Sequence, residues 1–149
     1  MKTAIAHYDH LPDISRIERL SYHPDLVTSQ EGFTKILDST GVLGELLVVL
    51  DKRFDVMGFA HFSFAEPKVL TLFDIAVDPT RRNRGVAKLA LRRLLKMAKD
   101  HKRKYLRLHV PQSNAAAVAL YFRLGFRAVS VLEKYYPEEK DGWVMELKL

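Results

Sequence analysis

A short basic segment has the composition of a phosphate-binding turn: Arg82-Asn83-Arg84-Gly85-Val86-Ala87-Lys88. It follows an apolar run at residues 72–77 and precedes a stretch with helical periodicity, so it spans a strand-to-helix junction. The first turn of a helix has N–H groups without partners and partial positive charge, which together attract anions. Gly85 lets a phosphate approach the backbone closely because it has no Cβ. We therefore expect an anion site here, one suited to a pyrophosphate.

This segment differs from two common nucleotide-binding patterns. It lacks the Gly-Lys-Ser/Thr ending of the Walker motif and the three glycines of the dinucleotide fingerprint. Nucleoside triphosphates and NAD are therefore disfavoured. Arg81 adds one more cation beside the segment. The alternative interpretation is a solvated basic helix start, since a glycine among arginines is common in proteins.

The composition is that of one globular domain covering residues 1–149. The net charge of +6 suits a polyanionic partner, and much of the excess lies between Arg81 and Lys104. The absence of cysteine excludes disulfides, thiolate metal sites and a cysteine nucleophile. We expect no bound metal, because the histidines other than His109 do not have the spacing of metal ligands: His7, His10, His23, His61 and His101. No apolar stretch suggests a membrane span or a signal peptide, so we expect a cytoplasmic protein.

Hydrophobic periodicity predicts a mixed α/β fold with helices on both faces of a sheet that is neither all-parallel nor doubly wound. Asp9 is the expected N-cap of the first helix, and Asp141-Gly142 is the expected turn before the last strand. A strand before the first helix is left open. The expected helices cover residues 11–20, 29–37, 85–99 and 114–124, and the expected strands cover 46–50, 56–64, 69–77, 105–110, 126–136 and 143–149.

Two segments resemble sequence motifs of the GNAT superfamily of N-acetyltransferases. Ile75-Ala76-Val77-Asp78-Pro79, followed by Arg-x-x-Gly-x-Ala, resembles motif A. The run from Ser113 to Tyr121, followed by Leu124-Gly125-Phe126, resembles motif B. With Tyr135-Tyr136-Pro137, the chain looks most like RimI-type and protein N-terminal acetyltransferases. The resemblance implies a central, twisted, largely antiparallel mixed sheet of about six to seven strands with about four helices on both faces.

The resemblance also implies an activity: transfer of an acetyl group from acetyl-CoA to a primary amine, directly within a ternary complex. A protein N-terminal α-amine, such as that of a ribosomal protein, is the implied acceptor. Backbone groups of Ile75, Ala76 and Val77 would bind the pantetheine arm and the acetyl carbonyl, and Tyr121 would protonate the leaving thiolate. The other implied cofactor-binding residues are Arg82, Asn83, Arg84, Gly85, Val86, Ala87, Lys88 and Asn114.

The general base is left open among His109, Asp74 and a water. His109 ends the polar face of its expected strand, at a position where RimI-like enzymes have a glutamate and some N-terminal acetyltransferases a histidine. Imidazole titrates near neutral pH, so base chemistry remains available. Asp74 stands where RimI-like proteins often have asparagine, and a carboxylate there could also bind the substrate by accepting a hydrogen bond from its ammonium group. The structural alternatives are a hydrogen-bonded surface histidine, an arginine-paired carboxylate and, for Tyr121, an aromatic packing residue.

The resemblance places the acceptor between two loops that contain Tyr22 and His23 in one and Tyr135 and Tyr136 in the other, although their Pro, Asp and Glu content is also ordinary turn composition. A small-amine acetyltransferase and a non-catalytic acyl-CoA-binding module are the competing hypotheses. A nucleic-acid binder ranks last, because the basic cluster lacks interleaved aromatic residues for base stacking. The sequence leaves open a monomer or a homodimer.

Overall fold

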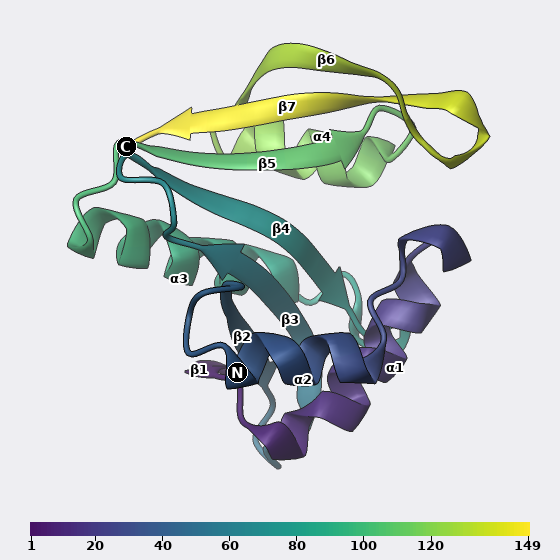
Figure 1. Cartoon of the computed structure of the whole chain (residues 1–149), viewed down its shortest axis with the longest axis vertical. Helices are drawn as coiled ribbons and strands as arrows, with labels where there is room; N and C mark the ends of the chain where they lie inside the picture. The colour runs from purple at the N-terminus through teal and green to yellow at the C-terminus, as the bar shows by residue number, and fades with distance from the viewer.

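The computed structural model describes residues 1–149 as one seven-stranded mixed sheet with four α-helices (Figure 1). The strands lie in the order β1-β2-β3-β4-β5-β7-β6, and only β4 and β5 run parallel. The strands are β1 Lys2–Ile5, β2 Glu45–Leu50, β3 Val56–Ser63, β4 Val69–Val77, β5 Tyr105–Pro111, β6 Arg127–Tyr136 and β7 Lys140–Lys148. The helices are α1 Leu11–Ser21, α2 Gln30–Asp38, α3 Val86–Asp100 and α4 Ala115–Arg123.

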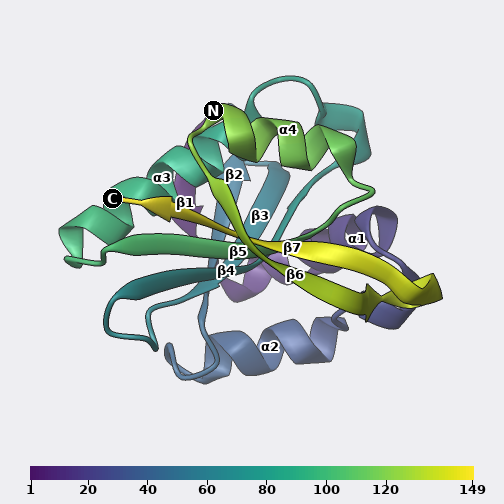
Figure 2. The ribbon, with the colours of Figure 1, turned by 90° about the horizontal axis from the view of Figure 1, so that it is seen from above.

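Two apolar cores lie on opposite faces of this sheet. Figure 2 shows α3 and α4 on one side and α2 on the other. Leu94 of α3 and Met145 of β7 belong to the first core. Ile14 of α1, Phe33 of α2 and Phe59 of β3 belong to the second. The predicted mixed sheet covered on both faces is therefore confirmed, and no helix is both long and apolar enough to cross a membrane.

Two local predictions are wrong. Asp9 does not cap α1: it lies in a 3-10 turn, and the N-cap is His10, with Pro12 in the first helical turn. Asp141-Gly142 lies inside β7, and the chain reverses at Pro137–Glu139 instead. The reason is that Gly142 serves close packing, since a Cβ there would lie 2.4 Å from Cε2 of Tyr136.

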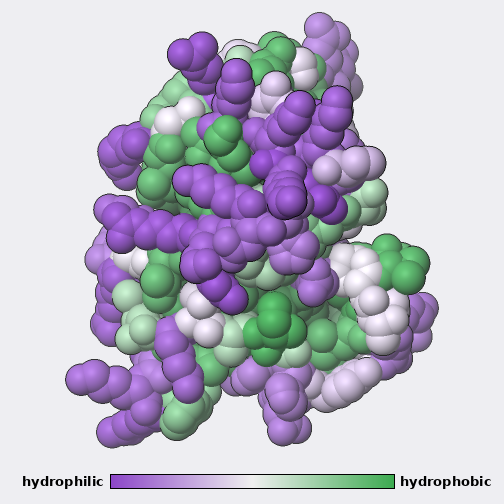
Figure 3. Space-filling view, turned by 90° about the vertical axis from the view of Figure 1, so that its left-hand side faces the viewer, coloured by the Kyte–Doolittle hydropathy of each residue, from purple (hydrophilic) through white to green (hydrophobic).

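Basic side chains cover the outer surface of α3. Figure 3 shows hydrophilic side chains spread over the side of the molecule on which α3 ends. Arg92, Arg93, Lys96 and Lys99 of this helix are all exposed, while its opposite face is buried in the core. The positive charge expected between residues 81 and 104 therefore lies at the surface.

Candidate active site

The sheet opens between β4 and β5. Their pairing extends from Val69–Tyr105 to Leu72–Leu108 and then stops. Beyond that point β4 continues beside β3 alone, while β5 continues beside β7, and Figure 1 shows the two strands diverging. We call this region the β4–β5 opening. Backbone groups at the free edge of β4 have no neighbouring strand there.

The register of β3 and β4 decides which groups of β4 face the opening. The amide of Asp78 donates to the carbonyl of Met57 in the β3 direction. Because backbone groups of successive residues alternate in direction, those of Ala76 also face β3, and those of Ile75 and Val77 face the opening. The Ile75 carbonyl accepts a hydrogen bond from the Tyr22 hydroxyl at 2.5 Å. Val77 thus presents a free N–H to the opening. The backbone groups of Ala76 face β3 instead, so they are not directed at the opening where the predicted cofactor contact would be made.

The segment of residues 82–88, the phosphate cradle, begins α3 without a capping side chain. Gly85 is the N-cap residue, with φ of 80°, and Asn83 is also left-handed, with φ of 61°. The first helical bond runs from Leu89 to Gly85, and no amide from Arg82 to Lys88 donates to a protein acceptor. Such a run of free amides fits an anion such as the pyrophosphate of coenzyme A. Arg81 lies outside the cradle because its guanidinium pairs with Asp51 at 2.9 Å.

Tyr121 lies on α4 and packs in the core on the face of the sheet that α3 also covers. The Oδ1 atom of Asn114 accepts the amide of Ala117 at 3.2 Å and so caps the helix. Tyr121 is only 5% exposed, and its ring packs 5.6 Å from that of Phe126. Burial, with a smaller effect from the Asp74 charge, raises the pKa of Tyr121 far above its ordinary value. The phenol therefore stays protonated at ordinary pH, so it can donate a hydrogen bond or a proton.

His109 lies on the opposite face of β5 from the buried Leu106 and Leu108. Its ring meets that of Tyr135 edge-on at 5.6 Å, and Tyr135 meets Tyr136 at 5.0 Å. Partial burial, then the charge of Arg107, lower the pKa of His109. The imidazole is therefore neutral at pH 7 and able to accept a proton.

Tyr136 extends from the β6–β7 hairpin towards Tyr121. Its charge contributes to the raised pKa of Tyr121, and burial raises the pKa of Tyr136 itself to about 12. The absent Cβ of Gly142 leaves the space that the ring occupies. The two tyrosines therefore approach the same region from different elements.

Glu18 is a site residue that the sequence reasoning missed. It is 1% exposed on α1, and its Oε1 accepts the amide of Thr28 at 3.1 Å. Its carboxyl group interacts with that of Asp74 on β4, and Tyr22 also contacts Asp74. The missed signal was positional: Glu18 falls on the apolar stripe formed by Leu11 and Ile14, where a charged residue is unusual.

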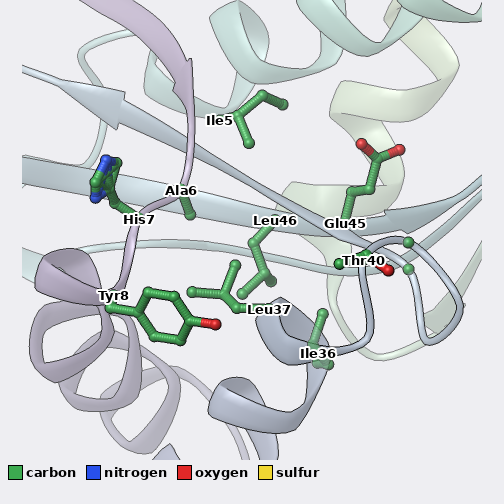
Figure 4. Close-up of a pocket in the computed structure, with 11 residues that line it drawn as sticks. Ile5, Ala6, His7, Tyr8, Ile36, Leu37, Thr40, Glu45 and Leu46 are labelled. Carbon is green, nitrogen blue, oxygen red and sulfur yellow. The ribbon is translucent and has the colours of Figure 1, made fainter.

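The structure brings several of the predicted site residues together. Tyr22 and Asp74 form one group with Glu18, while Tyr121 and Tyr136 lie near it. His23 does not join them: it is exposed, and its Nδ1 accepts the amide of Asp25 at 3.2 Å. A separate surface pocket between β1, the end of α2 and the start of β2 contains none of these residues (Figure 4).

Comparison with known proteins identifies the family to which the chain belongs. The model of the "Acetyltransferase (GNAT) family" matches residues 9–126. The [ribosomal protein bS18]-alanine N-acetyltransferase of Salmonella typhimurium is 39% identical over 82 residues, which are 53% of this chain and 55% of that protein. The match thus spans about half the length of this curated relative.

Solved structures agree over nearly the whole chain. The ribosomal-protein-S18-alanine N-acetyltransferase of Escherichia coli superposes with a TM-score of 0.85 at 27% identity, covering 99% of this chain and 92% of that one. The yncA acetyltransferase of Salmonella typhimurium, solved with its cofactor acetyl-CoA, shares the fold with a TM-score of 0.84 at 18% identity, covering 100% and 94%. These likenesses confirm the predicted GNAT fold, and the family model together with the curated relatives confirms the predicted class of enzyme. Since the family model matches well over half of its residues, the chain belongs to the acetyltransferase (GNAT) family.

Proposed function

We propose that this protein transfers an acetyl group from acetyl-CoA directly to a primary amine, specifically the N-terminal α-amine of a protein such as a ribosomal protein. The observation that supports this best is the β4–β5 opening, which joins two chemically different surfaces. The phosphate cradle lies at the start of α3, which packs on one face of the sheet, and His109 and Asp74 lie on the other face. Donor and acceptor can therefore approach the same opening from opposite sides.

The cradle and the free edge of β4 are the proposed binding surface for the cofactor. Acetyl-CoA would supply the acetyl group as a thioester, an activated acyl group with a thiolate leaving group. The free amides of residues 82–88 and the side chains of Arg82, Arg84 and Lys88 suit its phosphates. The backbone groups of Ile75 and Val77 at the edge suit the amide-rich pantetheine arm. Asn114 keeps its side-chain NH₂ available while its Oδ1 caps α4.

Two groups of the protein are placed to stabilise developing negative charge. The N–H of Val77 faces the opening and can donate to a carbonyl oxygen as that oxygen becomes anionic. The hydroxyl of Tyr121 can donate to the departing sulfur, because burial keeps it protonated. Neither group needs to reorganise much: β4 is held by β3, and Tyr121 is packed against Phe126.

His109 is the proposed general base. Its pKa is lowered, so a neutral imidazole is present at pH 7 to take the proton that the amine must lose. An N-terminal α-amine has an ordinary pKa of about 7.7–8.0, against about 10.4 for lysine, so it loses its proton more easily. Tyr22, Tyr135 and Tyr136 would form the walls around the entering residue. The named activities of the bS18-alanine relatives support the same class of acceptor.

A panel assay tests this proposal. Purified protein would be given acetyl-CoA and, in separate reactions, N-terminal peptides of ribosomal proteins, lysine-containing peptides with blocked N-termini, and polyamines. Release of free thiol and the mass of each acceptor would be measured. We expect α-acetylated peptides. Acetylation of polyamines alone would replace the proposal with a small-amine acetyltransferase, and tight coenzyme A binding without any thiol release would indicate a non-catalytic module.

A further inference from the structure

Glu18 has a buried carboxyl oxygen for which the protein provides no hydrogen-bond donor. Its Oε1 accepts the amide of Thr28, but its Oε2 has no donor partner and is shielded from solvent. The group beside it is the carboxyl of Asp74. A buried oxygen without a donor costs free energy comparable to a lost hydrogen bond. Two neighbouring carboxyl groups in a buried site cannot both be ionised without compensation, so the arrangement requires a proton or a cation.

A shared proton satisfies this requirement. Two carboxyl groups can hydrogen-bond only if one is protonated, so the pair carries one proton and one negative charge. Burial, and then the hydrogen bond with Asp74, raise the pKa of Glu18 to about 9. Burial also raises the pKa of Asp74, while the neighbouring Glu18 and Tyr22 side chains lower it in part. Glu18 is the more deeply buried of the two, at 1% exposed against a partly buried Asp74, so Glu18 holds the proton and Asp74 carries the charge.

No cationic side chain neutralises that charge. Neither carboxylate forms an ion pair with lysine or arginine. The titratable groups that interact with Asp74 are Glu18 of α1, Tyr22 just after α1, His61 of β3 and Tyr121 of α4. Of these, only His61 can become positive, and burial lowers its pKa, which favours its neutral form. The negative charge of the pair is thus left for a ligand.

Asp74 also lies where an acceptor would arrive. It follows Leu72, the last residue of β4 that pairs with β5, and it precedes Val77, whose N–H faces the opening. Its neighbours are Glu18 of α1 and Tyr22, the residue that follows α1, and this helix covers the same face of the sheet as His109. A cationic group bound at Asp74 would therefore lie beside the free edge of β4.

We propose that the Glu18–Asp74 pair is the ammonium-binding subsite of this acceptor site, in which Asp74 meets the positive charge and Glu18 is a positioning residue that donates to Asp74. This inference rests on the proposed function. It makes the acceptor a cationic primary amine and excludes hydroxyl or neutral amide acceptors. One negative charge shared by two carboxyl groups binds the ammonium without a surplus of charge that would prevent its later loss of a proton to His109.

Three variants separate the charge from the packing. Glu18→Gln replaces the protonated carboxyl by an amide that can still accept from Thr28 and donate to Asp74. The double variant Glu18→Gln/Asp74→Asn has the same shape but no charge. Asp100→Asn removes an exposed carboxylate at the far end of α3, which pairs only with Lys96, and serves as the matched control.

The experiment measures binding without turnover. Protein saturated with coenzyme A is titrated calorimetrically, at a pH where the amine is protonated, with a short peptide beginning with alanine and with its des-amino analogue. We expect the wild type, Glu18→Gln and Asp100→Asn to bind the ammonium peptide about tenfold to a hundredfold more tightly than the analogue, the range of a charge-assisted hydrogen bond. The double variant should show a preference below about twofold. Retention of the full preference in the double variant would overturn the proposal.

Kinetics keep the test decisive if the double variant is unstable. Glu18→Gln should then keep the wild-type KM for the peptide, while Glu18→Ala, which loses the donor, should raise KM and move the acid limb of kcat/KM to higher pH. Equal KM values and superimposable pH profiles for these two variants would also overturn it. The subsite and the proposed function can be refuted independently. If the wild type acetylates peptides but the preference ignores the pair, the subsite is wrong. If it binds ammonium peptides through the pair yet acetylates none, the proposed function is wrong.

Discussion

Replacing Glu18 by glutamine should make the protein more stable at alkaline pH, although it removes a buried residue's native side chain. In the folded protein Glu18 retains its proton up to a pKa of about 9, whereas an ordinary glutamic acid has a value of 4.5. Between these two pH values the folded state binds one more proton than the unfolded state. Stability therefore falls as pH rises across this window, because unfolding releases the proton. Glutamine has no proton to release.

The magnitude follows from the size of the window. One pKa unit corresponds to about 1.4 kcal/mol, so a rise from about pH 6.5 to about pH 8.5 costs the wild type at most about 2.7 kcal/mol. Water entry and relaxation around the buried pair reduce this to about 1–2 kcal/mol. For a chain of this size, 1 kcal/mol shifts Tm by about 2–4 °C. The window avoids the histidines with lowered pKa, His10, His61 and His109, which affect stability below about pH 6.5.

The assay is thermal unfolding of the wild type and Glu18→Gln at several pH values across this window, at constant ionic strength. We expect the two Tm values to diverge with pH, the variant gaining about 2–8 °C over the wild type between the two ends. Asp74→Asn should also flatten the profile, because a single remaining carboxylate can ionise freely beside an amide donor. Parallel profiles for all three proteins would refute the shared proton, and a divergence in the opposite direction would refute the sign of the argument.

Three further predictions concern the proposed chemistry. Tyr121→Phe should lower kcat about a hundredfold or more with little change in the Kd for coenzyme A, measured by calorimetry, because only the donated proton is lost. His109→Ala should remove a limb of the kcat/KM profile that lies below about pH 6.5, since the wild-type pKa is lowered; an unchanged profile would exclude His109 as the base. Gly142→Ala should raise the KM for the peptide while changing Tm only slightly. The reason is that a Cβ at this position would lie 2.4 Å from Cε2 of Tyr136 and would displace that ring.

Periodicity in the sequence was enough to locate nearly all helices and strands. The apolar stripes of α1 and α3 and the alternation along β5 are local properties, and each matches the observed burial. The cap at Asn114 and the left-handed Gly125 were equally readable. The Asp141-Gly142 prediction failed because a turn signal and a close-packing requirement call for the same residue, and only the position of Tyr136 distinguishes them.

The β4–β5 opening is not encoded in any short segment. The pair stops at Leu72 and Leu108 because β4 stays with β3 while β5 follows β7, a choice made by strands distant in sequence. The positions of Tyr121 and Asp74 relative to each other depend on that divergence. The resemblance to the family predicted that these two residues share one site, whereas hydrophobic periodicity alone could not predict it.

The identity of residue 74 links the two parts of this site. An asparagine there, as the family resemblance leads one to expect, would donate a hydrogen bond to an ionised Glu18, and no proton would be needed. Aspartate gives the same net charge but requires a proton on Glu18 and moves the negative charge from α1 to β4. The charge then lies on the strand whose free edge presents the Val77 amide. This single carboxylate thus accounts both for a site that attracts ammonium beside that edge and for a fold that loses stability as the pH rises.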